Sequence, residues 1–140
     1  MKETWHYTDA RNVKSILKKG LIPYRLNLKA VSEATRKEWG IKNPKGVWLW
    51  KKRQRGVSHA GIILNQFVRK EAKKVALLRV LVKHEEVNSW PNKLSISTYH
   101  VGFIGKWYYH WRTQAWISRV KIPPERIKLV KVYDVVKLLQ

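Results

Sequence analysis

The sequence contains no cysteine, and this absence removes several kinds of chemistry at once. Disulfides, iron–sulfur clusters, thiolate zinc sites and a cysteine nucleophile are all excluded. The sequence also has no signal-peptide pattern and no apolar run near the ~20 residues needed to span a bilayer. We therefore expect a cytoplasmic protein with no membrane partner. The lack of cysteine is also typical of proteins from thermophiles.

Several recognisable catalytic and binding motifs are missing too. No Gly-x-Ser-x-Gly turn is present, so a serine hydrolase has little support. No glycine-rich phosphate-binding motif of the Walker or Rossmann kind appears. The spacing of the histidines does not give the two-and-two ligand arrangement of a zinc site, so we expect no metal.

Acidic residues are scarce, whereas basic residues are abundant. Nine Asp and Glu face 30 Lys and Arg, which gives a net charge of +21. Such a field attracts polyanions, and nucleic acid is the commonest polyanion in a cytoplasm. Thermophile surfaces usually enrich Glu together with Lys, so surface adaptation alone accounts poorly for the imbalance. The charge predicts a nucleic-acid partner, either DNA or RNA.

The chain length and the apolar patterns predict a single α+β domain over residues 1–140. The predicted helices are concentrated in the N-terminal half, and most strands follow them in an antiparallel or mixed sheet. A first helix should begin at a Thr8 or Asp9 cap and end at Gly20, and a second should be capped by Ser58. The weaker helix candidate is Lys29–Trp39. The predicted strands are Trp5–Tyr7, Gly46–Trp50, Val75–Val82, Leu94–Tyr99, His100–Phe103, Thr113–Val120 and Ile127–Tyr133.

The order of these parts resembles the ADP-ribosyltransferase fold. The resemblance comes from a strand that ends in His6, a capped helix ending "ILKKGLIP", the later strand "GVWLW", and the tail "QAWISRVKIPPERI". It covers nearly the whole chain in order, although "ILKKGL" alone is also an ordinary helix end. The resemblance implies two small, mainly antiparallel sheets around a cleft that binds NAD as a substrate.

The resemblance also implies roles for particular residues. His6 matches the histidine that hydrogen-bonds the ribose next to nicotinamide, and Tyr7 and Thr8 stand where many members have Gly-Thr. Trp48 falls where a tyrosine stacks on the nicotinamide, and a tryptophan still offers a flat ring. A partly buried histidine bonded to a neighbouring backbone is the alternative interpretation of His6.

Gln114 falls where this family carries its catalytic carboxylate. A neutral amide can bond a ribose hydroxyl, but it cannot offset developing positive charge as an anion does. The resemblance and the positive charge together make an ADP-ribosyltransferase-like protein acting on or bound to nucleic acid the first hypothesis. A non-catalytic nucleic-acid-binding protein and an RNA 2′-phosphotransferase-like enzyme remain alternatives. The last class has the same fold, and Arg11, Arg53, Arg55 and Arg112 could serve its phosphate chemistry.

Two basic segments are the candidates for nucleic-acid binding. The run "KKRQRG" supplies Lys51, Lys52, Arg53 and Arg55 between a predicted strand and helix, where phosphates are favoured. The run "KWYYHWR" mixes aromatic rings with cations, as single-stranded bases and phosphates require. Its expected outward residues are Lys106, Tyr108, His110 and Arg112. The alternatives are a solvated loop for the first run and core packing of alternate aromatics for the second.

Overall fold

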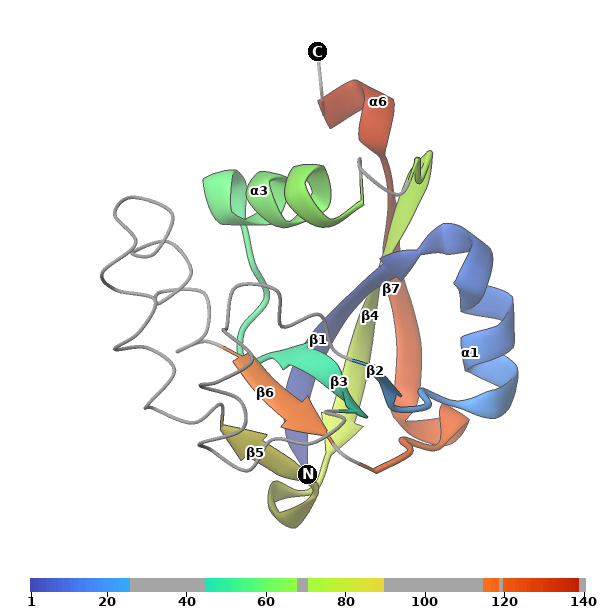
Figure 1. Cartoon of the computed structure of the whole chain (residues 1–140), viewed down its shortest axis with the longest axis vertical. Helices are drawn as coiled ribbons and strands as arrows, with labels where there is room; N and C mark the ends of the chain where they lie inside the picture. Colours follow the sequence, from blue (N-terminus) through green and yellow to red (C-terminus); the bar gives the residue numbers. More distant parts are fainter. Residues whose placement is uncertain (26–44, 68–70, 90–114, 119, 139–140) are drawn as a thin grey trace.

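The computed structural model of the chain describes residues 1–25, 45–67, 71–89, 115–118 and 120–138 (Figure 1). Its helices are α1 (Val13–Lys19), α3 (Gly56–Gln66) and α6 (Val135–Leu138). Short 3-10 turns are η1 (Ala10–Asn12), η3 (His84–Glu86) and η4 (Pro124–Arg126). The strands are β1 (Lys2–Asp9), β2 (Tyr24–Arg25), β3 (Lys45–Trp50), β4 (Lys74–Val82), β5 (Val87–Ser89), β6 (Ala115–Ser118) and β7 (Ile127–Asp134).

The described strands form one sheet in the order β5-β6-β3-β1-β4-β7, and β2 pairs with the first two residues of β3, Lys45 and Gly46. Each pairing is antiparallel, which confirms the α+β class and the antiparallel sheet. The prediction of two separate small sheets is not met within the described residues, because one path links six of these strands and β2 joins the same sheet through β3.

This sheet is narrowly joined at its centre. β1 pairs with β4 along its whole length, from Lys2 to Asp9, but it meets β3 at the single position Trp5↔Trp50. Beyond that position the two strands separate. The sheet therefore has a β5-β6-β3 part and a β1-β4-β7 part, which diverge from one junction (Figure 1).

β4 explains how the two faces of the sheet are covered. Val75 and Leu77 belong to one buried cluster, with Ile62 and Ile63 of α3. Leu78, Val80 and Val82 belong to a second cluster, against which Ile16 of α1 packs. Alternate side chains of a strand point to opposite faces, so α3 and α1 cover different faces of the sheet. The prediction that Val75–Val82 forms a central strand is confirmed, since β4 lies between β1 and β7.

The predicted end of the first helix at Gly20 is confirmed, whereas the predicted cap Asp9 lies at the 3-10 turn η1 and the residue before α1 itself is Asn12, whose side chain makes no capping bond. The Asp9 carboxylate accepts a hydrogen bond from the Arg11 backbone N–H at 3.0 Å and so caps the turn that leads into α1. Gly20 ends α1 with a φ of 90°, a left-handed value that glycine adopts without strain. The next residue, Leu21, exchanges two backbone hydrogen bonds with Ile122, which ties this end of α1 to the segment after β6.

The predicted cap of the second helix is wrong. α3 begins at Gly56, with Arg55 as the residue before it, so Ser58 lies inside the first turn. The Ser58 hydroxyl instead donates to the side chain of the buried Gln54.

Of the described helices, α6 lies at the C-terminal end and not in the N-terminal half. Within the same ranges, no helix is both long and apolar enough to cross a membrane.

Candidate functional site

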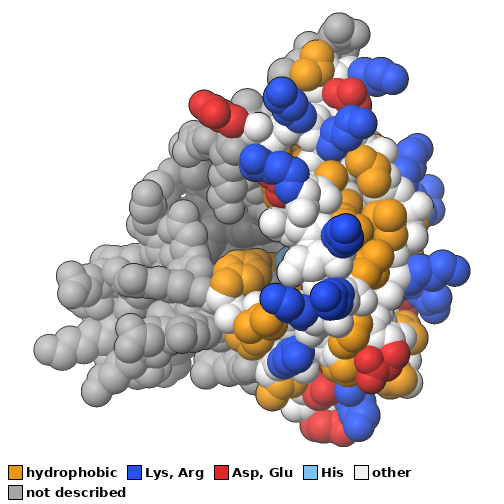
Figure 2. All heavy atoms as spheres, turned by 90° about the vertical axis from the view of Figure 1, so that its right-hand side faces the viewer, with side chains coloured by type: hydrophobic (Ala, Val, Ile, Leu, Met, Phe, Trp, Pro, Cys, Tyr) orange, Lys and Arg blue, Asp and Glu red, His pale blue; other side chains and the backbone are white. Residues whose placement is uncertain are grey.

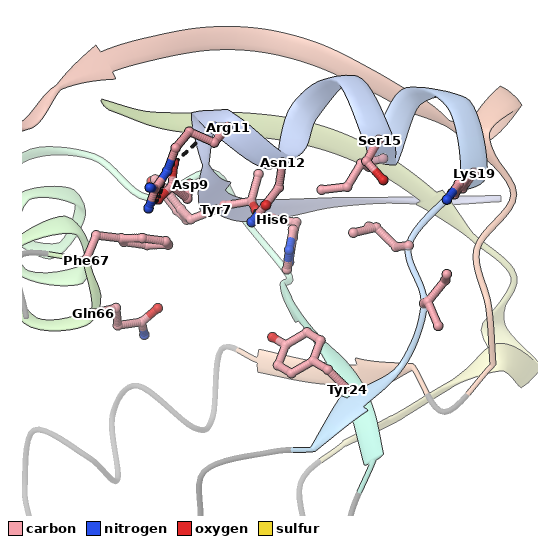
Figure 3. Close-up of a pocket in the computed structure, with 15 residues that line it drawn as sticks. His6, Tyr7, Asp9, Arg11, Asn12, Ser15, Lys19, Tyr24, Gln66 and Phe67 are labelled. Atoms are coloured by element: carbon pink, nitrogen blue, oxygen red, sulfur yellow. Dashed lines mark hydrogen bonds and ion pairs between the residues drawn. The ribbon is translucent and has the colours of Figure 1, made fainter. Parts of the chain in front are cut away.

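A hollow of about 580 Å³ opens beside the point where β1 and β3 separate. Its walls come from the end of β1, from α1, from Tyr24 of β2 and from the C-terminal end of α3 (Figure 3). Figure 2 shows a depression on the α1 side of the molecule, with Lys and Arg side chains around its described rim. Ligand pockets commonly have volumes of about 300–1,000 Å³, so the hollow suits a small molecule of nucleotide size.

His6 lies at the centre of this arrangement. Its Nδ1 lies 2.8 Å from the backbone oxygen of Trp48, so the side chain bridges the two strands just beyond their junction. A carbonyl only accepts, so Nδ1 carries the proton and Nε2 of the neutral ring is an acceptor. Burial lowers the pKa of His6 below its usual value, and the bond to Trp48 opposes part of that decrease. His6 is therefore a neutral side chain with one nitrogen left to accept a hydrogen bond from a ligand.

Tyr24 and Gln66 complete the walls nearest to His6. Both residues line the main hollow and also a recess of about 40 Å³ that extends from it toward Trp48. The Tyr24 ring lies across the hollow from α1, and the His6 ring points into the space between them (Figure 3). The site thus offers a neutral imidazole, an amide and an aromatic face within one concave surface.

Asp9 and Arg11 form an ion pair at one end of the hollow (Figure 3). Arg11 donates from Nε and Nη2 to the two carboxylate oxygens, and the Nη2 to Oδ2 distance is 2.7 Å. Hydrogen bonds from the Arg11 side chain and backbone lower the pKa of Asp9 below its usual range. Asp9 is the one acidic side chain among the described residues that line the hollow, and its charge is already paired.

A second polar cluster lies under α3. The Tyr7 hydroxyl is 2.7 Å from Nδ1 of His59, whose ring packs against Tyr133 at 4.4 Å between centroids. Burial, together with the charges of Arg53 and Lys131, lowers the pKa of His59. Nε2 of His59 is buried and makes no hydrogen bond to the described residues. Among the residues that the structure describes, no three His, Asp or Glu side chains gather in a group that could hold a metal ion.

The structure brings together part of the predicted site. His6, Tyr7 and Thr8 line the main hollow, and Trp48 lines only the adjoining recess. Trp48 contributes its backbone oxygen to the fixing of His6, a role that the sequence pattern did not indicate. Gln114 lies outside the described residues, as do Lys106, Tyr108, His110 and Arg112. In the sequence, Gln114 immediately precedes β6, whose first residue, Ala115, pairs with Trp50.

The basic run after β3 does not line the hollow. Lys52 and Arg55 are exposed, whereas Lys51 and Arg53 are half-buried. The Lys51 ammonium lies over the ring of Trp116, and the Arg53 guanidinium lies over the ring of Trp5. The structure therefore separates this run into two solvated cations and two cations that contact aromatic rings.

Sequence reasoning missed several residues that line the hollow, namely Asn12, Ser15, Lys19, Tyr24 and Gln66. Ser15 and Lys19 are spaced four residues apart and therefore share one face of α1. This spacing could have indicated that the two side chains lie together. Nothing in the sequence indicates that Tyr24 and Gln66 lie near His6, because only the packing of β2 and α3 brings them there.

No protein-family model matches this chain, and no curated protein or solved structure matches it either.

Proposed function

We propose that this protein is an ADP-ribosyltransferase-like domain that binds NAD in the hollow beside His6 and acts on, or while bound to, nucleic acid. One observation carries this proposal. His6 stands at the fork between β1 and β3, with Nδ1 fixed by the Trp48 carbonyl and Nε2 left as an acceptor. A fixed acceptor in a hollow is what a ribose hydroxyl requires.

Other features support the same assignment. The hollow has the volume expected for a nucleotide-sized ligand. Tyr24 offers an aromatic face to a flat ring, and it does so from β2, not from the position of Trp48. The strand path β5-β6-β3-β1-β4-β7 diverges at one junction, and this divergence fits a cleft between two small sheets.

A second candidate, an RNA 2′-phosphotransferase-like enzyme, is favoured by the charges in the hollow. Arg11 and Lys19 line it together with His6, whereas its one described acid is bound to Arg11. Guanidinium and ammonium groups neutralise phosphoryl oxygens, but they do not stabilise an oxocarbenium-like cation. The replacement of the expected carboxylate by Gln114 points in the same direction.

The decisive experiment uses two substitutions at His6. In His6→Asn the amide nitrogen takes the place of Nδ1 and keeps the bond to Trp48, but the Nε2 acceptor is lost. In His6→Gln the amide reaches the place of Nε2, but the donor to Trp48 is lost. We expect His6→Asn to keep the stability of the natural protein and to bind NAD about three- to tenfold more weakly. His6→Gln should lose more stability than affinity.

Calorimetric titration with NAD and denaturant unfolding measure both quantities. If the natural protein binds no NAD, or if His6→Asn binds it unchanged, His6 is a packing residue and the proposal is wrong. Incubation with labelled NAD and separate pools of DNA, RNA and protein then identifies the acceptor. Transfer of a 2′-phosphate from RNA to the ADP-ribose part of NAD, with release of nicotinamide and without labelling of a macromolecule, would favour the second candidate.

A further inference from the structure

A second hollow, of about 500 Å³, adjoins the first one. Asp9 and Arg11 belong to the walls of both, so their ion pair stands at the boundary between the two. The far hollow is lined in addition by Glu71, Lys73 and Lys74. The β1–β4 pairing explains this placement, because its last position is Asp9↔Val75 and Lys74 therefore lies beside the start of η1.

Arg11 is both exposed and fixed. Its side chain is 77% exposed, whereas that of Asp9 is 15% exposed. Nε and Nη2 bind the Asp9 carboxylate, and Nη1 makes no hydrogen bond to a described residue. A guanidinium that is held in place and open to solvent is preorganised to bind a phosphate, since little side-chain freedom remains to be lost.

The cations follow one another across the two hollows. In Figure 3, Lys19 and the Asp9–Arg11 pair lie at opposite ends of the first hollow, with His6 between them. Lys73 and Lys74 lie beyond Arg11 in the second hollow. A row of separated cations suits a chain of phosphates better than a single phosphate. A nucleotide can meet a ligand at the boundary of the His6 hollow only when it is unpaired, so the row suits a single strand better than a duplex.

We infer that single-stranded nucleic acid lies along the second hollow, with its phosphates on Arg11, Lys73 and Lys74 and its terminal nucleotide at the Asp9–Arg11 boundary, beside the His6 hollow. Asp9 is a positioning residue that holds Arg11 toward the strand. The chemistry at the terminal nucleotide rests on the proposed function, whereas the path of the strand does not. The run Lys51–Arg55 lines neither hollow and stays a prediction for phosphate contacts elsewhere on the surface.

The first test compares two double variants by fluorescence anisotropy with a short labelled single-stranded RNA and DNA. Lys73→Ala with Lys74→Ala should weaken binding and reduce the slope of log K against log salt by about 1.4, or about 0.7 for each phosphate contact. Lys121→Ala with Lys128→Ala removes the same charge from exposed residues elsewhere. It should change the slope much less. Equal effects of the two double variants would overturn the proposed path.

The second test separates positioning from charge. Asp9→Asn and Asp134→Asn each remove one negative charge, and each asparagine can still accept the backbone hydrogen bond that the aspartate accepts. If charge alone mattered, both variants would bind the strand more tightly. We expect Asp134→Asn to do so slightly, and Asp9→Asn to bind about three- to tenfold more weakly because Arg11 is released. Tighter binding by Asp9→Asn would overturn its positioning role.

Titration with NAD distinguishes this inference from the proposed function. Lys73→Ala with Lys74→Ala should leave NAD affinity unchanged, because neither residue lines the His6 hollow. If no variant binds NAD while the strand results hold, the NAD proposal fails and the strand path stands. If NAD binds but the double variant at Lys73 and Lys74 binds the strand as the natural protein does, the strand path fails and the NAD proposal stands. Competition by polyglutamate as strong as that by an oligonucleotide of equal charge would overturn a nucleic-acid partner.

Discussion

The substitution Gly20→Ala tests how closely the end of α1 approaches the chain after β6. At Gly20 a Cβ atom would lie 2.2 Å from the backbone oxygen of Ile122, a distance that requires the backbone to move. Movement would break the pair of hydrogen bonds between Leu21 and Ile122, each 2.9 Å long. These bonds contribute about 0.5–1.5 kcal/mol each. The left-handed φ of 90° adds about 1–2 kcal/mol of strain for alanine.

The expected loss of unfolding free energy for Gly20→Ala is therefore about 2–5 kcal/mol. Gly56→Ala is the matched control, since Gly56 also has a positive φ, of 59°, but its added Cβ would meet no described atom within 4 Å outside its own helix turn and chain neighbours. It should lose only the strain, about 1–2 kcal/mol. Urea unfolding of both variants gives the comparison. An equal loss in the two variants would refute the close approach at Gly20 and with it this wall of the hollow.

Three further predictions concern pH, catalysis and charge. The pKa values of His6 and His59 are lowered in the folded protein, so the unfolded state binds more protons as the pH falls. The unfolding free energy should therefore be constant with respect to these two groups above about pH 6.5 and should decrease on acidification, by at most about 1.4 kcal/mol per pH unit for each histidine. Urea unfolding at pH 7.5 and pH 5 measures this decrease. NAD cleavage by the natural protein should be weak; Gln114→Glu should raise it in a product assay, and His6→Ala should remove the gain, whereas no gain would contradict the alignment of Gln114. Alanine at Lys51, Lys52, Arg53 and Arg55 together should flatten the salt dependence of nucleic-acid binding, and an unchanged slope would contradict a role for that run.

The sequence predicted those elements whose burial is set by local pattern. Val75–Val82 is apolar at successive positions because β4 is covered on both faces, and such a run identifies a central strand. The end of α1 was predictable because Gly20 satisfies a backbone requirement that few other residues meet. The start of α3 was not, because Ser58 is a good cap by type, yet its hydroxyl binds Gln54.

The candidate site was less predictable, because long-range packing forms its walls. His6 was identified through a resemblance, but its partner is a backbone oxygen 42 positions away, which no side-chain motif records. The density of charge in Lys51–Arg55 was visible in the sequence. Its relation to the rings of Trp5 and Trp116 was not, because β1 and β6 bring those rings to it.

The two interpretations of His6, packing and ligand binding, are consequences of one geometry. β1 keeps its pairing with β4 as far as Asp9, but its pairing with β3 stops at Trp5. Where a strand separates from its neighbour, backbone groups lose their ladder hydrogen bonds and need other partners. At this point Nδ1 of His6 donates a hydrogen bond to the backbone oxygen of Trp48. The same bond fixes the tautomer and leaves Nε2 as an acceptor. The residue that closes the fork in the sheet is therefore also the residue prepared to bind a hydroxyl, so loss of function in His6→Ala alone would not distinguish the two roles.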